Sequence, residues 1–307
     1  MKSEHTFSYI GKTIGLTILN LFVWMIATGV MNNIFGVHVD ASDDVQAGTM
    51  MFILLAVTLV NTAVMVYMLK RTAWSGWKLV GVIVWVFWGL NSFMTQIEGW
   101  FFNDALQMPG EMMLALASAV LVQSVVFALV AVTVFKRWQP EKEQQKTLMD
   151  GVKIPGGELV IKLLFLAVLF YPIVYYLFGY YVLWQIEEAR VVYTGTTEIL
   201  PLFAHTSNVL RNNVWLWPWQ VMRAFIFISF AWLVMKKSTA NWVGTGLLVG
   251  LLFAVLMNMQ QWIPNPYLPL SVRAGHFWET VPSNFIWGFV IVWLLHRSHR
   301  SPGELLQ

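Results

Sequence analysis

Eight long apolar runs constrain this chain more than any other feature of its sequence. About 20 apolar residues in a helix are needed to cross the roughly 30 Å of hydrocarbon in a bilayer. The runs cover residues 13–36, 49–70, 76–97, 112–135, 158–184, 216–235, 241–262 and 276–297. Only 11% of the residues are charged, against about 25% in soluble domains, which argues against a soluble, disordered or nucleic-acid-binding chain. We therefore predict an all-α, polytopic membrane helix bundle with about eight transmembrane helices.

The basic residues alternate from one connection to the next along the chain. Of the 19 Lys and Arg residues, most fall in the N-terminal segment, the even-numbered connections, the start of the fifth run or the C-terminal tail. The exceptions are Arg190, Arg211, Arg223 and Arg273. Cytoplasmic loops are enriched in Lys and Arg, so the alternation predicts that both termini lie in the cytoplasm. It also predicts that the first run is a retained span, not a cleaved signal peptide.

A polar segment divides the chain into two halves with four runs each. We predict a first membrane half over 1–135, a cytoplasmic linker over 136–157 and a second half over 158–307. The two halves share a spacing, because Arg71, Trp77, Gly81 and Gln96 recur as Lys236, Trp242, Gly246 and Gln261. A duplication that carries four spans preserves direction, so the halves would be parallel repeats about the membrane normal. The alternative is that no duplication occurred, and that these residue types recur because any cytoplasmic turn followed by a membrane helix favours them.

Ionisable side chains beside the apolar runs mark candidate sites, and most lie on the predicted outer side. Gln96 lies at the end of the third run and Glu98 directly after it, Glu188 follows the fifth, and His276 and Glu279 open the eighth. His276 and Glu279 are three residues apart, so on a helix they share a face. That spacing suits an acid/base pair, part of a metal site or a hydrogen bond that caps a helix. His276, Glu279 and Glu98 are the predicted catalytic candidates.

Three arginines are candidates for binding a ligand. Arg211 and Arg273 lie on the otherwise acidic outer side, and Arg223 lies in the sixth run. They favour an anionic ligand because guanidinium groups match carboxylates and phosphates. Arg223 lies five residues after Pro218, where the sixth helix is expected to start. Its side chain either reaches back to the interface or faces the bundle and pairs with Glu98 or Glu188. The predicted binding residues are Arg211, Arg223, Arg273, Asn284, Gln96 and Glu188.

The sequence lacks the residues that several kinds of chemistry require. The chain has no cysteine, which removes disulfides and thiolate nucleophiles. It has no GxxxxGK[ST] phosphate loop, no HExxH zinc pair and no GxSxG nucleophile turn. The polar residues near mid-span are Asn20, Thr58, Asn61 and Gln123, with no carboxylate among them. We predict neither a cofactor nor a bound metal.

The EEAR segment at 187–190 resembles the CAAX-protease and bacteriocin-processing family of intramembrane glutamic hydrolases. In that family an Arg lies four residues after the second Glu, and a His is followed four residues later by Asn. Here Arg190 is two residues after Glu188, and His276 is followed by Thr280. The departures put a glutamic hydrolase site in doubt.

The segments NPYLPLSVRAGHFWETVPSNFIWG, FGYYVLWQ and LRNNVW resemble a group of uncharacterised bacterial multi-pass membrane proteins. The resemblance covers most of the second half and implies a bacterial inner-membrane location, without an assigned activity. The residues that match the polar pattern of that group are Arg211, Arg273, His276, Glu279 and Asn284.

Three functions remain open on the sequence. The first is a transporter or binding protein for a small solute, with a site between the two halves that opens outward. The second is an enzyme that acts at the outer surface on a lipid or lipid-linked substrate, with His276 as acid/base oriented by Glu279 or Glu98. The third is a membrane subunit or assembly factor without its own site. The expected partners are the lipid bilayer and a small solute or lipid substrate, and no nucleic acid.

Overall fold

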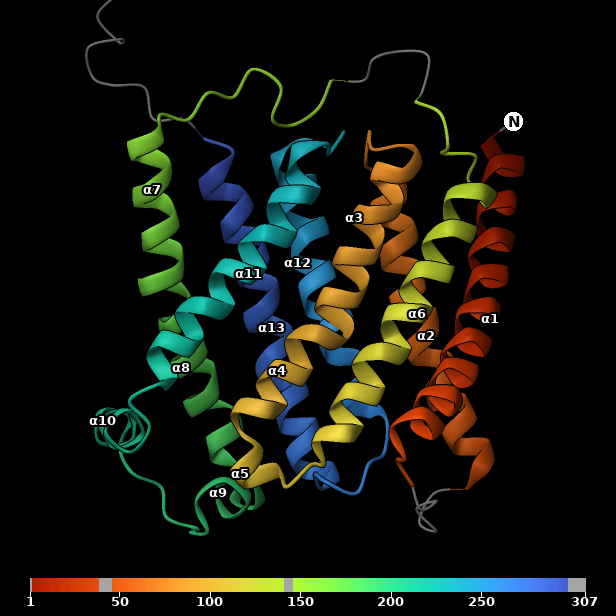
Figure 1. Cartoon of the computed structure of the whole chain (residues 1–307). Helices are drawn as coiled ribbons and strands as arrows, with labels where there is room; N and C mark the ends of the chain where they lie inside the picture. Colours follow the sequence, from red (N-terminus) through yellow and green to blue (C-terminus); the bar gives the residue numbers. More distant parts are fainter. Residues whose placement is uncertain (1, 39–45, 141–145, 298–307) are drawn as a thin grey trace, which may run out of the picture.

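The computed structural model describes residues 2–38, 46–140 and 146–297, and within these ranges the chain forms helices and no strands. Eight helical segments of this part are long and apolar enough to cross a membrane. They are Ser8–Phe35, Ala47–Lys70, Gly76–Phe101, Gly110–Val134, Gly156–Gln185, Leu216–Lys236, Trp242–Trp262 and Leu270–Leu295. They run up and down side by side (Figure 1). The prediction of an all-α, polytopic helix bundle is thereby confirmed.

Several spans consist of consecutive helical pieces. The first half contains α1 (Lys2–Phe35), α2 (Ala47–Lys70), α3 (Gly76–Trp88), η1 (Gly89–Phe93), α4 (Met94–Phe101), α5 (Asn103–Leu106) and α6 (Gly110–Val134). The second half contains α7 (Gly156–Leu164), η2 (Phe165–Phe170), α8 (Tyr171–Tyr181), η3 (Leu183–Gln185), α9 (Glu187–Thr194), α10 (Leu202–Asn212), α11 (Leu216–Lys236), α12 (Trp242–Asn258), η4 (Met259–Trp262) and α13 (Leu270–Leu295). The third and fifth spans each include a π-helical turn, η1 and η2, and such turns occur often at functional sites.

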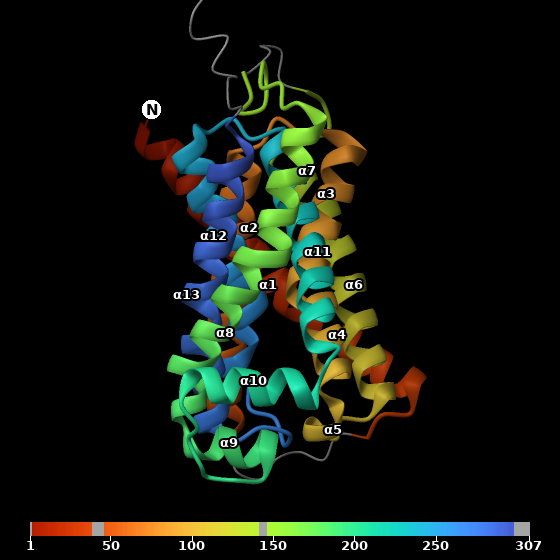
Figure 2. The ribbon, with the colours of Figure 1, turned by 90° about the vertical axis from the view of Figure 1, so that its left-hand side faces the viewer.

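The eighth span differs from its prediction. It begins at Leu270, directly after Pro269, and not at residue 276. His276 is therefore in the second turn of α13, and Pro282 lies inside the helix. The connection 186–215 also differs, because it folds into α9 and α10 where a loop was expected. Figure 2 shows α10 lying across the direction of the spans.

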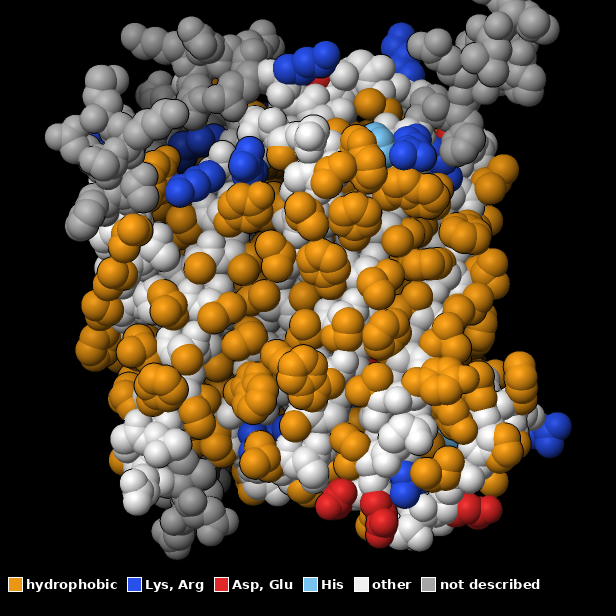
Figure 3. Space-filling view, turned by 180° about the vertical axis from the view of Figure 1, so that it is seen from behind, with side chains coloured by type: hydrophobic (Ala, Val, Ile, Leu, Met, Phe, Trp, Pro, Cys, Tyr) orange, Lys and Arg blue, Asp and Glu red, His pale blue; other side chains and the backbone are white. Residues whose placement is uncertain are grey.

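The two ends of the bundle carry opposite charge. Connections 71–75 and 237–241 and the segments 135–140 and 146–155 lie together at one end, here called the basic end, and connections 102–109, 186–215 and 263–269 lie at the other, the acidic end (Figure 1). On the face seen in Figure 3, Lys and Arg side chains gather at the basic end, Asp and Glu at the acidic end, and a hydrophobic belt separates them. Exposed tryptophans flank the belt, with Trp77 near the basic end and Trp100 and Trp215 near the acidic end, as expected for side chains at membrane interfaces.

The packed core fills the half of the bundle nearer the basic end. Fully buried aromatic rings meet there in pairs: Phe87 and Phe127 have ring centroids 5.2 Å apart, and Phe227 and Phe253 have centroids 5.0 Å apart. Both pairs belong to one continuous hydrophobic cluster. This end of the membrane interior is therefore closed by apolar side chains.

Helices α12 and α13 pack backbone to backbone. A Cβ added at Gly288 of α13 would lie 2.9 Å from the Cα of Gly250 in α12. One turn along α12, Gly246 is covered by the ring of Phe289, which a Cβ there would meet at 2.8 Å. Gly246 and Gly250 form the small-xxx-small spacing that lets membrane helices approach closely. This contact fixes α13 against α12, and both helices carry residues of the candidate site.

The two halves of the chain also meet at the basic end. The backbone N–H of Ala73 donates to the Lys237 carbonyl at 2.7 Å, and the N–H of Thr239 donates to the Arg71 carbonyl at 2.8 Å. Helix α2 packs against α12, and α3 packs against α11. The shared spacing relates α2 to α11 and α3 to α12. A two-fold axis along the membrane normal would therefore turn the contact of α2 with α12 into the contact of α3 with α11. The duplication itself stays a prediction.

Candidate functional site

A cavity of about 1100 Å³ lies between the two halves of the chain, in the half of the bundle nearer the acidic end. Spans from both halves line it. It extends from Asp104 and Glu198, in the connections at the acidic end, to Asn61 and Gln123 near the middle of α2 and α6. Ligand pockets commonly measure roughly 300–1000 Å³, so this cavity has room for a small organic ligand.

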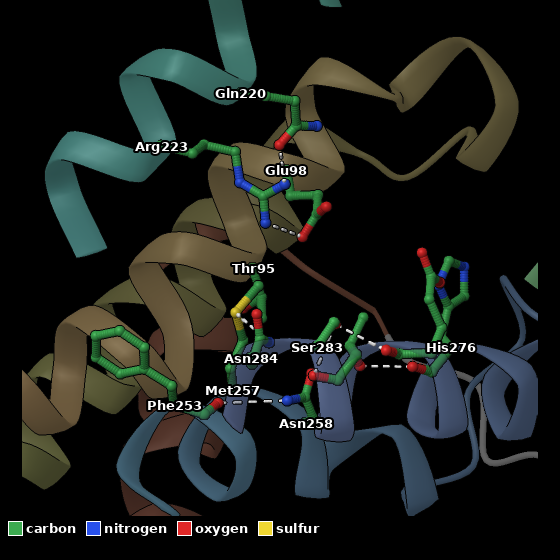
Figure 4. Close-up of polar contacts among 12 residues, drawn as sticks. Thr95, Glu98, Gln220, Arg223, Phe253, Met257, Asn258, His276, Ser283 and Asn284 are labelled. Atoms are coloured by element: carbon green, nitrogen blue, oxygen red, sulfur yellow. Dashed lines mark hydrogen bonds and ion pairs between the residues drawn. The ribbon is translucent and has the colours of Figure 1, made fainter. Parts of the chain in front are cut away.

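An ion pair joins the two halves along one wall of the cavity. Arg223 on α11 is 2% exposed, and its Nη2 lies 2.7 Å from Oε2 of Glu98 on α4. Its Nη1 donates to Oε1 of Gln220 at 3.0 Å, because residues three apart on a helix share a face. Figure 4 shows this group on one side of the site. Of the two carboxylates considered as partners for Arg223, the structure pairs it with Glu98.

A second polar row lies on α13. Nδ1 of His276 is 3.1 Å from Oε2 of Glu279, and Nε2 of His276 is 2.8 Å from the Tyr193 hydroxyl on α9. Burial raises the pKa of Tyr193, and the carboxylates of Glu279 and Glu98 raise it further. Tyr193 is therefore a neutral phenol, and the His276 ring bridges its hydroxyl and the Glu279 carboxylate through its two nitrogens. The row holds His276 in one orientation.

Asparagine and serine side chains from α12 and α13 continue the polar wall next to this row (Figure 4). Asn258 donates to the Ala254 carbonyl at 2.8 Å, and Asn284 donates to Sδ of Met257 at 3.5 Å. Ser283 donates to the Glu279 carbonyl at 2.7 Å. All three side chains are buried and line the cavity. Most of their donors are therefore satisfied by α12 and α13 themselves.

Polar groups at mid-span form a small network at the deep end of the cavity. Gln123 donates to Oδ1 of Asn20 at 2.9 Å, Asn20 donates to Thr62 at 3.2 Å, and Asn61 donates to Oδ1 of Asn91 at 3.4 Å. These bonds join α1, α2, α6 and η1, as polar residues between membrane helices commonly do. The acceptor oxygens Oδ1 of Asn61 and Oε1 of Gln123 are buried without a partner in the described part of the chain.

Three of the predicted binding residues lie away from the cavity. The guanidinium of Arg273 donates to the carbonyls of Gln261, Ile263 and Leu268, at 2.9 to 3.2 Å, and so holds the 261–268 connection. Arg211 is exposed on α10, where it lines a separate surface groove, and Glu188 is exposed on α9.

The cavity lining does contain the other predicted residues. They are His276, Glu279, Glu98, Arg223, Asn284 and Gln96. The resemblance of EEAR to a glutamic hydrolase finds no matching geometry, since Glu187 and Glu188 are exposed and Arg190 donates to the carbonyls of Thr197 and Trp184.

Two residues of the 186–215 connection line the cavity through helices that the sequence did not predict. Tyr193 was not considered, because α9 was not foreseen and a lone Tyr in a presumed loop gives no signal. His205 lies on α10, which was not foreseen either, and its ring packs between Tyr180 and Trp184, with centroids 5.5 Å and 4.6 Å away. Burial lowers the pKa of His205, which favours the neutral imidazole at the mouth of the cavity.

Within residues 2–38, 46–140 and 146–297, no three His, Asp or Glu side chains come together as a set of metal ligands. Comparison with models of protein families, with curated proteins and with solved structures gave no match. The family resemblances therefore stay predictions. The eight apolar helices define an integral, multi-pass membrane protein.

Proposed function

We propose that this chain is a transporter for a small solute in the bacterial inner membrane, with its cavity open on the extracytoplasmic side. The positive-inside rule favours a cytoplasmic basic end, where α1 starts and α13 ends. The observation that carries the proposal is the cavity itself, which lies between the two halves and reaches from the acidic end to Asn61 and Gln123 at mid-span. Transporters commonly bind their substrates near the bilayer midplane, between repeats.

The other side of the membrane is closed by the packed core and by the backbone hydrogen bonds that join the two halves at the basic end. On α6, Phe127 follows Gln123 by one turn toward the basic end, and its ring packs against Phe87 of α3. Opening this side requires one half to move against the other, which separates Phe230 of α11 from Trp85 and Gly89 of the third span. Rocking of two halves about a fixed site is the usual way in which such proteins alternate access.

A second candidate is an enzyme that acts on a lipid or lipid-linked substrate at the outer surface. The observation that favours it is the row of Tyr193, His276 and Glu279, which is the arrangement a general acid/base needs: a proton-carrying group held by a carboxylate. The depth of the cavity favours transport, because surface chemistry does not need a cavity that reaches mid-span.

Access from the basic end tests the proposal. Ala131 lies one further turn along α6 beyond Phe127 and is fully buried. Because the chain has no cysteine, Ala131→Cys carries the only thiol. In inside-out vesicles, a membrane-impermeant maleimide should label Ala131→Cys slowly, as the closure opens during transport. Leu248→Cys, which is buried in the core on α12, should stay unlabelled and controls for general unfolding. A transporter is contradicted if Ala131→Cys stays as inert as Leu248→Cys, while Lys146→Cys in the same vesicles is labelled.

A further inference from the structure

The charges that line the cavity favour a cationic ligand over the anionic one that the arginines suggested. Among the described residues, the lining contains the carboxylates Glu98, Asp104, Glu198 and Glu279. Its one guanidinium, that of Arg223, is already paired with Glu98. The lining therefore keeps a negative excess, which remains even when His276 is protonated.

Glu279 is the carboxylate that most needs a cation. It is 5% exposed, and in the described part of the chain no Lys or Arg forms an ion pair with it. Oε2 contacts His276, and Oε1 faces Gly179 of α8, where an added Cβ would lie 3.4 Å away. A buried carboxylate without a cationic partner is costly, and a positively charged ligand would remove that cost.

Aromatic rings stand next to this carboxylate. Tyr171, Tyr175 and Gly179 are four residues apart along α8, so they share one face, and all three line the cavity. Tyrosine rings attract ammonium groups through their electron-rich faces. Because Gly179 has no side chain, the Glu279 carboxylate approaches this face of α8 closely.

The deep end of the cavity offers acceptors as well. Asn61 is 5% exposed and Gln123 4% exposed. Their amide nitrogens donate within the bundle, and Oδ1 of Asn61 and Oε1 of Gln123 have no partner in the described part of the chain. An ammonium donor would satisfy such oxygens, whereas an anion would not.

From these observations we infer that the cavity binds an organic cation, with an ammonium group held by Glu279 and the tyrosine face of α8. The inference rests on the proposed function, since it names the substrate class of the same cavity. It replaces the anionic solute expected from Arg211, Arg223 and Arg273.

The charge preference of a thiol placed in the cavity tests this inference. Thr95 lines the cavity one turn before Glu98 on α4 (Figure 4). Thr95→Cys in purified protein would be reacted in parallel with the cationic trimethylammonium-ethyl and the anionic sulfonatoethyl methanethiosulfonates. The normalised ratio is the rate constant for the cationic reagent divided by that for the anionic reagent, divided again by the same quotient for 2-mercaptoethanol. It should be about ten.

Paired variants assign the preference to the named carboxylate. Glu279→Gln should lower the normalised ratio several-fold, and Glu187→Gln, an exposed carboxylate of α9 outside the lining, should leave it unchanged. If Glu279→Gln does not fold, Asp104→Asn in the lining near the mouth should lower the ratio in the same direction.

The outcomes separate this inference from the proposed function. A normalised ratio of one or less overturns the cationic ligand but not the proposed function. A ratio that neither cavity variant changes has the same meaning. If Thr95→Cys reacts with neither reagent, while exposed Gln185→Cys reacts with both, no solute enters from the acidic end. That result overturns the proposed function and the cationic ligand together.

Discussion

Arg223→Leu is expected to destabilise the protein strongly. It leaves the Glu98 carboxylate in the bundle without its cation and removes the donor to Gln220. Breaking one partner of a buried pair costs about 3–5 kcal/mol, and because the Glu98 side chain keeps 29% exposure, we expect about 3 kcal/mol. Unfolding in detergent, followed by the fluorescence of the 17 tryptophans, measures the loss.

Two comparisons isolate the ion pair in this measurement. Arg211→Leu removes an exposed guanidinium of α10, so it should change the free energy of unfolding by less than about 0.5 kcal/mol. The double variant Arg223→Leu/Glu98→Leu removes both charges and should recover most of the loss. Equal and small effects of Arg223→Leu and Arg211→Leu would show that Arg223 is not a buried charge.

Gly288→Leu is the second substitution with a large expected effect. Even a single Cβ at residue 288 would lie 2.9 Å from backbone atoms of Val249 and Gly250, and backbone cannot move aside as a flexible side chain can. Overpacking typically costs about 1–3 kcal/mol, and a leucine between two backbones should exceed that range. We expect α13 to separate from α12 and the yield of monodisperse protein in detergent to collapse.

Gly81→Leu is the matched control for that variant. Gly81 lies within α3, and a Cβ there would meet nothing within 4 Å. It should be purified in normal yield with normal thermal stability. A Gly288→Leu protein as stable as Gly81→Leu would mean that the α12–α13 contact is looser than the structure has it. His276 and Glu279 would then lose the support that this contact gives to α13.

The spans could be predicted from the sequence because their signals are local. Hydropathy finds each helix without reference to any other, and the alternation of Lys and Arg checks the count. The start of α13 was missed by six residues, because Arg273 interrupts the apolar pattern of the stretch 270–275. It is helical nonetheless, with Arg273 bonded to carbonyls of the preceding connection.

The site could be predicted only in part, because it is assembled from distant segments. Arg223 and Glu98 are 125 residues apart in sequence, and only a rule that buried charges need partners brought them together. The same rule did not show that the guanidinium of Arg273 is satisfied by backbone carbonyls. Three arginines therefore suggested an anion, although the folded lining is acidic. Tyr193 had no signal in the sequence.

The measurement that tests the central claim most directly is labelling at the deep end of the cavity. Asn61→Cys and Asn91→Cys would be made separately in this cysteine-free chain and treated in intact cells with a small membrane-impermeant maleimide. We expect both positions to react from outside, and Lys146→Cys at the basic end to react only after permeabilisation. If Asn61→Cys and Asn91→Cys stay inert while exposed Gln185→Cys reacts, no water reaches mid-span, and the cavity does not serve transport.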